Sequence, residues 1–367
     1  MERLYFCGDA NDGAMRVGWA LIDCTDDLGE SAPEDMKDEG DYQYWFYFRA
    51  SGKKTAASDT EGNVTKGING KKYTFDTNGV MQSTWYQVAT PAVIGGATQS
   101  NATTYHYYNS PEEGWLNRKG WFKQVPSEYM NTGAYNDESA KWYYADASGD
   151  LITKQFKTIN GKKYAFNKNG EMLSGLQALK LNAKDEIIAN AGIDTDKKID
   201  ALVNREVYTD ADGNVTDFTT SDWIVYYFGS GDDGSMKSGN QTIVVDGDAY
   251  SYILAKTGVN KGQGKDSLTE GGLIDKKYVV ARGMKIKADS DLKYQAVDIT
   301  GKKYTVNELE DGRTYYLVNT SGNVVTNKTS GVKDADGYYF TTNKDGIIQG
   351  VYKDKENGAF VGEVFTK

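Results

Sequence analysis

Apolar and polar side chains alternate in several short stretches of the chain, and turn residues separate these stretches. In KKYTFDT, Tyr73 and Phe75 fall on one face of an extended strand, and Thr74 falls on the other. The dipeptide Asn-Gly stands before and after this stretch, and it is typical of two-residue hairpin turns, which need positive φ at both central positions. The pattern therefore predicts strand, turn, strand, turn, strand.

The same segment is written twice. INGKKYTFDTNGVM, residues 68–81, returns 91 residues later as INGKKYAFNKNGEM, residues 159–172, with ten of the fourteen positions identical. A lone hairpin is marginal in water, but a stack of hairpins buries one apolar face against the next. We therefore expect the recurrent apolar positions to face a core: Tyr73, Phe75 and Met81 in the first copy, and Tyr164, Phe166 and Met172 in the second.

Weaker copies of this unit follow one another along most of the chain. About eleven aromatic strands can be counted, each followed within a few residues by a glycine turn. They lie in residues 4–19, 44–53, 105–121, 142–156, 225–239, 248–262, 276–286, 301–304, 314–325 and 337–350, besides the duplicated segment. This repetition predicts an all-β fold, a repetitive β-hairpin solenoid.

Two stretches interrupt the pattern. Residues 27–41 are acidic and rich in turn formers, and residues 181–206 contain Ile199, Leu202 and Val203 at helical spacing, with Thr195 or Asp194 as a cap. The sequence thus predicts two solenoid segments, 1–180 and 221–367, around an irregular insertion at 181–220 with a short helix.

The composition of the chain limits the classes of partner that it can bind. The net charge of -10 and pI near 4.9 argue against binding to nucleic acid or anionic membrane surfaces, and no apolar run is long enough to insert into a membrane. The mean hydropathy of -0.63 and the 27 tyrosines suggest burial by aromatic rings in many small layers. The opening MERLYFCGDANDGAM has no apolar core of a signal peptide, and we expect leader and anchor sequences to lie outside this sequence.

Candidate catalytic and metal chemistry is sparse. One histidine, His106, excludes a two-histidine metal site, and its aromatic strand TYHYYN favours a structural role. Cys7 and Cys24 match no metal motif; a disulfide and two free thiols both remain open. The Asp-rich turns at 9–13, 210–214, 230–235 and 334–337 lack the EF-hand glutamate and helices, so turn chemistry is favoured over calcium. No nucleophile motif is present, and we expect no cofactor and no catalysis.

Several of these units resemble the cell-wall-binding repeats of Gram-positive surface proteins, the class that includes choline-binding and glucan-binding repeats. The shared pattern is Gly-Trp, a turn, Tyr-Tyr-Phe, a glycine turn, Met and again Gly-Trp. The matching stretches are YFCGDANDGAMRVGW, WYYADASGDLI, YYFGSGDDGSMKSG and YYFTTNKDGIIQG. The resemblance implies an extracellular, wall-associated module that binds a wall polymer or glycan, either teichoic-acid choline or a glucan. It leaves homo-oligomer formation open.

In such repeats, tryptophans and tyrosines of adjacent units form cages for choline or platforms for sugar rings, and a methionine often helps. By that resemblance the ligand-binding candidates are Trp19, Met81, Trp85, Tyr107, Trp115, Trp121, Trp142, Tyr144, Trp223 and Tyr227. The Gly-Trp tryptophan is replaced at Leu176, Asn240 and Val351, so sites should concentrate in residues 1–150. The alternative is that the tryptophans only cap the hydrophobic stack, which would make the chain a structural spacer or protein-contact solenoid.

Overall fold

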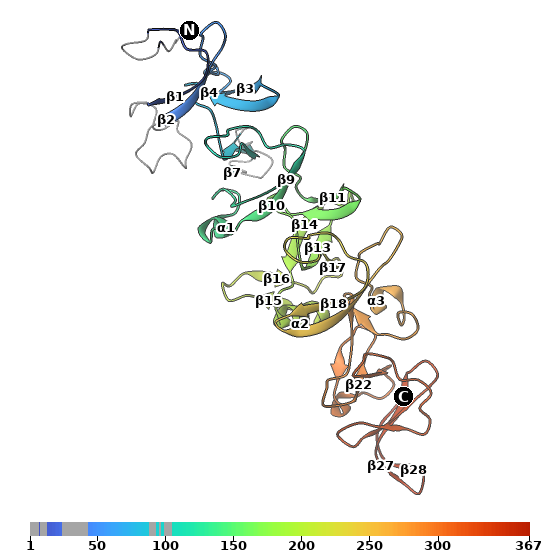
Figure 1. Cartoon of the computed structure of the whole chain (residues 1–367). Coiled ribbons are helices and arrows are strands. Elements are labelled where there is room, and N and C mark those ends of the chain that lie inside the picture. The colour runs from blue at the N-terminus through green and yellow to red at the C-terminus, as the bar shows by residue number, and fades with distance from the viewer. Residues whose placement is uncertain (1–6, 8–12, 24–42, 88–92, 95–96, 99–104) are drawn as a thin grey trace. The chain divides into compact units, whose positions relative to one another are not determined.

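The computed structural model describes residue 7 and residues 13–23, 43–87, 93–94, 97–98 and 105–367. The chain separates into two compact units: unit 1 comprises residues 1–155 and 166–172, and unit 2 comprises residues 156–165 and 173–367. Short hairpins in small antiparallel sheets make up most of both units (Figure 1). The predicted all-β repeat fold is therefore confirmed, whereas a division at residues 181–220 stays a prediction.

Unit 1 is a series of two-stranded sheets. Their strands pair as β1 with β2, β3 with β4, β5 with β8, β6 with β7 and β9 with β10. The bounds are β1 Gly18–Asp23, β2 Gln43–Phe48, β3 Asn63–Ile68, β4 Lys71–Asp76, β5 Trp85–Gln87, β6 Val93–Ile94, β7 Ala97–Thr98, β8 Tyr105–Tyr107, β9 Gly120–Gln124 and β10 Lys141–Ala145, with one short helix, α1 Thr132–Asn136.

The duplicated hairpin begins with the predicted turn. Asn69 and Gly70 have φ values of 48° and 80°, and Asn160 and Gly161 in the second copy have 48° and 77°. Both central residues thus take the positive φ that a type I′ turn requires. The same prediction is wrong for the Asn-Gly pairs after the strand, because only their glycines, Gly79 and Gly170, have positive φ, whereas Asn78 and Asn169 do not. The second copy forms the hairpin of β11 (Gln155–Ile159) and β12 (Lys162–Phe166).

The aromatic strands of unit 1 have one core face and one partly exposed face. In β2, Tyr44, Phe46 and Phe48 are buried, while Trp45 and Tyr47 between them are half-buried. Because side chains alternate along a strand, one row packs into the core and the other stays accessible. The predicted core positions are confirmed for the buried Tyr73, Phe75, Met81 and Phe166, whereas Tyr164 and Met172 are half-buried.

Unit 2 has wider sheets. Their strand orders are β14-β13-β17, β15-β16, β18-β19-β21-β20, β23-β22-β24 and β25-β26-β27-β28. The bounds are β13 Leu176–Leu181, β14 Ile187–Gly192, β15 Val207–Thr209, β16 Val215–Asp217, β17 Ile224–Tyr227, β18 Gly239–Val245, β19 Asp248–Leu254, β20 Val280–Ala281, β21 Met284–Lys285, β22 Tyr294–Val297, β23 Lys303–Tyr304, β24 Tyr316–Asn319, β25 Val332–Lys333, β26 Tyr339–Thr342, β27 Ile348–Glu356 and β28 Ala359–Thr366, with helices α2 Asp196–Asn204 and α3 Ser267–Glu270 and the 3-10 turn η4 Val306–Glu308.

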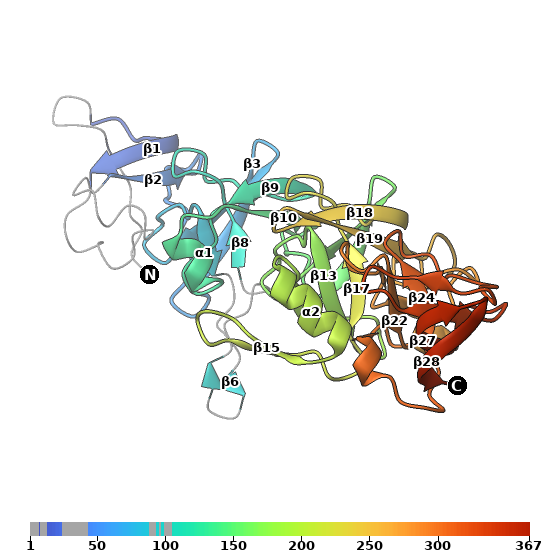
Figure 2. The same cartoon turned by 90° about the horizontal axis from the view of Figure 1, so that it is seen from below.

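The helix expected from Ile199, Leu202 and Val203 is α2. The Thr195 side chain caps it by accepting a hydrogen bond from the Lys198 backbone N–H at 3.2 Å. The three apolar residues are buried, and they pack beside strands β13 and β17 in one cluster (Figure 2).

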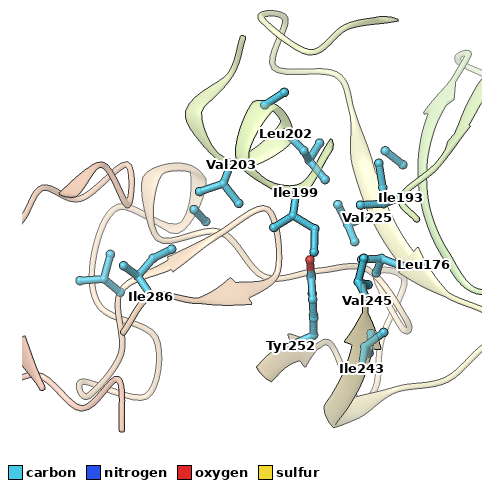
Figure 3. Packing of buried hydrophobic residues seen from close by; sticks show 14 of the residues in the cluster. Leu176, Ile193, Ile199, Leu202, Val203, Val225, Ile243, Val245, Tyr252 and Ile286 are labelled. Carbon is cyan, nitrogen blue, oxygen red and sulfur yellow. The ribbon is translucent and has the colours of Figure 1, made fainter. Parts of the chain in front are cut away.

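The main core of unit 2 is aliphatic. Leucine, isoleucine and valine side chains from α2 and from six strands, β13, β17, β18, β19, β22 and β24, meet in it (Figure 3). Three large rings, Phe218, Trp223 and Tyr252, lie among them. Burial by small aromatic layers, expected from the composition, holds for unit 1 and is wrong for this core. The reason is that sheets of three and four strands gather aliphatic residues that are far apart in sequence. No helix among the described residues is long and apolar enough to cross a membrane.

Candidate functional site

Three tryptophan–tyrosine pairs recur in unit 1 at the same position of three hairpins. In β1 and β2, Trp19 lies opposite Tyr47; in β5 and β8, Trp85 lies opposite Tyr107; in β9 and β10, Trp121 lies opposite Tyr144. Their ring centroids are 5.1, 5.1 and 5.2 Å apart. All six rings are half-buried, so each pair keeps part of its surface in solvent.

Each pair extends into a cluster with rings from neighbouring strands. Cluster 1 consists of Trp19, Trp45, Tyr47, Tyr73 and Phe75. The Trp19 centroid lies 4.7 Å from that of Tyr73, edge to face, and 5.9 Å from that of Phe75, stacked. These distances are the favoured ones for aromatic pairs. The arrangement holds the Trp19 ring against two rings of the duplicated hairpin, so its orientation is fixed before any ligand arrives.

Cluster 3 repeats cluster 1 and consists of Trp121, Trp142, Tyr144 and Phe166. The Trp121 centroid lies 6.4 Å from that of Trp142 at 88°, where Trp19 lies 6.4 Å from Trp45 at 86°. The backbone repeats too. The Met172 N–H donates to the Trp142 carbonyl at 2.8 Å, as the Met81 N–H does to the Trp45 carbonyl at 2.9 Å.

Cluster 2 consists of Trp85, Tyr107, Phe122 and Tyr143. The Tyr107 and Phe122 rings stack at 5.0 Å, and the Trp85 indole N–H donates to the Val125 carbonyl at 2.7 Å. Burial, followed by the negative charge of Glu171, raises the pKa of the Tyr143 hydroxyl. This cluster is thus anchored by polar contacts and lies within the electrostatic reach of a carboxylate.

Trp115 and Met81 lie beside cluster 1. Trp115 is half-buried and packs against the same buried group as Trp19, and its backbone pairs with Tyr73. Met81 is 5% exposed, and a Cβ added at Gly114 would come 2.2 Å from the Met81 methyl group. Met81 is therefore a buried packing neighbour of cluster 1, and Trp115 adds to the accessible surface of this cluster.

The two candidates from unit 2 lie in different surroundings. Trp223 is 7% exposed, contacts Phe218 and donates its indole N–H to the Asp217 carbonyl at 2.6 Å. The structure thus places Trp223 in the aliphatic core, away from the accessible rings. Tyr227 occupies the register position of Tyr107, but its partner across the sheet is the buried Leu176. The pair that clusters 1, 2 and 3 share is therefore not completed at Tyr227.

Several rings of these clusters are not among the ligand-binding candidates from the sequence: Trp45, Tyr47, Tyr73 and Phe75 in cluster 1, Phe122 and Tyr143 in cluster 2, and Phe166 in cluster 3. Tyr73, Phe75 and Phe166 were expected in the core, where they also lie. For Trp45 and Tyr47, the available signal was the alternation within YWFYF, which puts these two rings outside the core.

The polar residues that the sequence singled out make structural contacts. His106 pairs with Asp150, with 2.8 Å between Nε2 and Oδ1. Asp210 accepts hydrogen bonds from the backbone N–H groups of Asp212 and Asn214, which is turn chemistry. Within the described part of the chain, no three His, Cys, Asp or Glu side chains are grouped as a metal site. Cys24 lies outside the described residues, so its pairing with Cys7 stays open.

The chain is similar in sequence to proteins of streptococci. No family model matches the sequence. The chain is 27% identical over 199 residues to Glucosyltransferase-S of Streptococcus mutans, which covers 54% of this chain and 10% of that protein. It therefore spans about a tenth of that relative. Among solved structures, the choline binding domain of Spr1274 from Streptococcus pneumoniae is 29% identical, with a TM-score of 0.19, covering 32% of this chain and 99% of that chain. The predicted resemblance to choline-binding and glucan-binding repeats is confirmed.

Two longer structural matches are also from Streptococcus pneumoniae. CbpJ has a TM-score of 0.45 at 17% identity and covers 93% of this chain and 88% of its own. Choline binding protein F, solved in the presence of a peptidoglycan analogue, has a TM-score of 0.36 at 18% identity, with 94% and 89% covered.

Proposed function

We propose that this chain is a non-catalytic module that binds a cell-wall polymer or a glycan through clusters 1, 2 and 3. The observation that carries the proposal is the recurrence of one half-buried Trp–Tyr pair at the same register in three hairpins. A ring that served only the core would be buried, as Phe75 and Phe166 are. Three preserved, partly exposed pairs instead suit three similar ligand units along a polymer.

Two ligand chemistries suit such rings. A quaternary ammonium is attracted to the faces of converging aromatic rings, with about 0.5–2 kcal/mol for each favourable contact. A sugar presents an apolar face that can pack on a half-exposed indole, with its hydroxyls left to water and polar edges. The sequence likeness to a choline binding domain and to Glucosyltransferase-S makes choline and a glucan the two ligands to test.

Affinity would come from repetition. The rings of each site are half-buried by their neighbours and offer a ligand only part of their surface, so a single site should bind weakly. A polymer that engages two or three clusters at once binds far more tightly than one unit does, since later contacts are intramolecular. Such a module would act outside the cell, at the wall.

Unit 2 favours a second role, that of spacer. In the second copy of the duplicated hairpin, the position of Trp115 is held by the buried Ser235, and the position of the pair's tryptophan in β13 is held by Leu176. Both replacements remove rings while keeping the backbone pairing. We therefore assign ligand binding to unit 1 and a structural role to unit 2.

Tryptophan fluorescence tests the proposal. Choline and dextran are titrated separately into the wild-type chain, Trp121→Phe and the control Trp223→Phe, whose ring lies in the core. Saturable quenching by either ligand that Trp121→Phe weakens and Trp223→Phe leaves intact is expected. No response to either ligand would reject binding through these clusters and leave the spacer role for the whole chain.

A further inference from the structure

A lysine of unit 1 sits directly on one of the accessible rings. The Lys71 ammonium nitrogen lies 3.0 Å from the centroid of the Trp115 indole. Lys71 is exposed and Trp115 is half-buried, so the contact is formed at the surface. A cation at this distance from an indole face makes a favourable cation–π contact. The site thus already holds a positive charge supplied by the chain.

The position of Lys71 follows from the hairpin register. Tyr73 lies opposite Trp115, and the Leu116 N–H donates to the Lys72 carbonyl at 2.8 Å, which fixes this pairing. Lys71 and Tyr73 are two residues apart and share one face of β4. Lys71 is therefore the diagonal neighbour of Trp115, within reach of a long side chain. Lys72 points to the opposite face.

The ring that Lys71 covers belongs to the candidate site, since Trp115 packs against the group that contains Trp19 and Tyr73. A cationic ligand approaching this ring would have to displace the Lys71 ammonium or bind beside a like charge. A neutral sugar would meet no such repulsion and could use the lysine as a hydrogen-bond donor. The contact therefore distinguishes between the two ligand chemistries.

We propose that Lys71 is a specificity-determining residue that keeps cationic ligands off the Trp115 face and reserves it for neutral sugar units. This inference rests on the proposed function and assigns a ligand class to one part of it. Cation binding, where it occurs, is thereby directed to the Trp–Tyr pairs and away from the Trp115 face. In cluster 3, the nearest such lysine is much farther from its ring, with the Lys123 ammonium 5.7 Å from the Trp142 centroid.

The second copy of the hairpin shows that the contact depends on the tryptophan. The loop before Trp115 and the loop before Ser235 have the same backbone: Gly114 and Gly234 both have φ of 58°. The Met236 N–H donates to the Lys163 carbonyl at 2.7 Å, as Leu116 does to Lys72. The residue at the position of Lys71 is Lys162, and the residue at the position of Trp115 is Ser235, which has no ring. The lysine is thus common to both copies, and the capped ring exists only in the first.

The test compares Lys71→Met with Lys72→Met, which removes the same charge from the other face of the same strand. Choline and dextran are titrated into each, with and without Trp115→Phe, and binding is followed by tryptophan fluorescence. Lys71→Met should create or strengthen a Trp115-dependent choline component about tenfold, the size expected for one like charge at roughly 5 Å in a medium between protein and water. Lys72→Met should not, and dextran binding should not increase in either variant.

The outcomes separate the two proposals. Dextran or choline binding by the wild type, without a Trp115-dependent gain in Lys71→Met, would overturn this inference alone. An equal gain in Lys72→Met would also overturn it, because the cause would then be net charge. If neither ligand changes the tryptophan fluorescence of the wild type or of Lys71→Met, this inference and the proposed function are both overturned.

Discussion

The buried guanidinium of Arg282 holds a loop of unit 2 by its carbonyl groups. Arg282 is 5% exposed. Its Nη1 donates to the Trp223 carbonyl and its Nη2 to the Thr220 carbonyl, both at 2.7 Å, and two longer bonds of 3.3 Å reach Ser221 and Phe218. Replacement by methionine keeps an unbranched side chain, although a shorter and apolar one, and leaves these carbonyls without their donor.

The structure sets the size of the effect. A hydrogen bond from a charged donor contributes about 1.5–3 kcal/mol, so the two short bonds alone give about 3–6 kcal/mol. Part of this is offset, because burying a guanidinium is costly: burial, followed by the charge of Arg205, lowers the pKa of Arg282. We expect Arg282→Met to lower the free energy of unfolding of unit 2 by about 2–4 kcal/mol.

Native-state hydrogen exchange in increasing urea is the assay, read on peptides that span residues 218–225. The exposed Arg313, which pairs with Glu310 at 3.1 Å, offers the matched control Arg313→Met, and protection of these peptides should not change in it. If Arg282→Met left the protection of residues 218–225 as it is in the wild type, the reasoning from buried carbonyls would be refuted.

Three further predictions concern glycine, an indole and a carboxyl group. Gly114→Ala should destabilise unit 1 by about 1–2 kcal/mol more than Gly70→Ala in urea unfolding, since both have positive φ but only Gly114 faces Met81 at 2.2 Å; equal losses would refute the clash. Trp85→Phe should cost about 1 kcal/mol through the lost indole hydrogen bond, and an unchanged Tm would contradict this. Burial, then nearby carboxylates, raise the pKa of Asp200, so its neutral form is favoured in the folded state and stability falls as pH rises through that pKa. Asp200→Asn should therefore raise Tm at pH 7 but not at pH 3, and a rise of equal size at both would argue against the shift.

Local patterns predicted the parts of the fold that depend on neighbouring residues. The turns at Asn69-Gly70 and Asn160-Gly161, the core positions Tyr73 and Phe75, and the helix after Thr195 all follow from residues a few positions apart. The loss of ring pairs was also readable, because Leu176 stands where a Gly-Trp tryptophan would stand. These features need only the strand period and turn chemistry.

Features that depend on distant pairing could not be read in this way. Trp19 meets Tyr47 through a strand register that spans 28 positions, and no local pattern fixes such a register. Trp223 was expected to contact ligand, but its burial depends on Phe218 and on a core gathered from distant strands. The aliphatic core of unit 2 escaped notice for the same reason, because no single segment contains more than a few of its residues.

The most direct test of aromatic ligand binding is fluorine NMR of the chain labelled with 5-fluorotryptophan. Its seven tryptophans give separate probes, assigned by single Trp→Phe variants. On addition of choline or dextran, we expect saturable shifts for Trp121, Trp85 and Trp19, and none for the core residue Trp223. Resonances that stay in place with both ligands, or a shift confined to Trp223, would contradict the claim that the Trp–Tyr pairs of unit 1 form the binding surface.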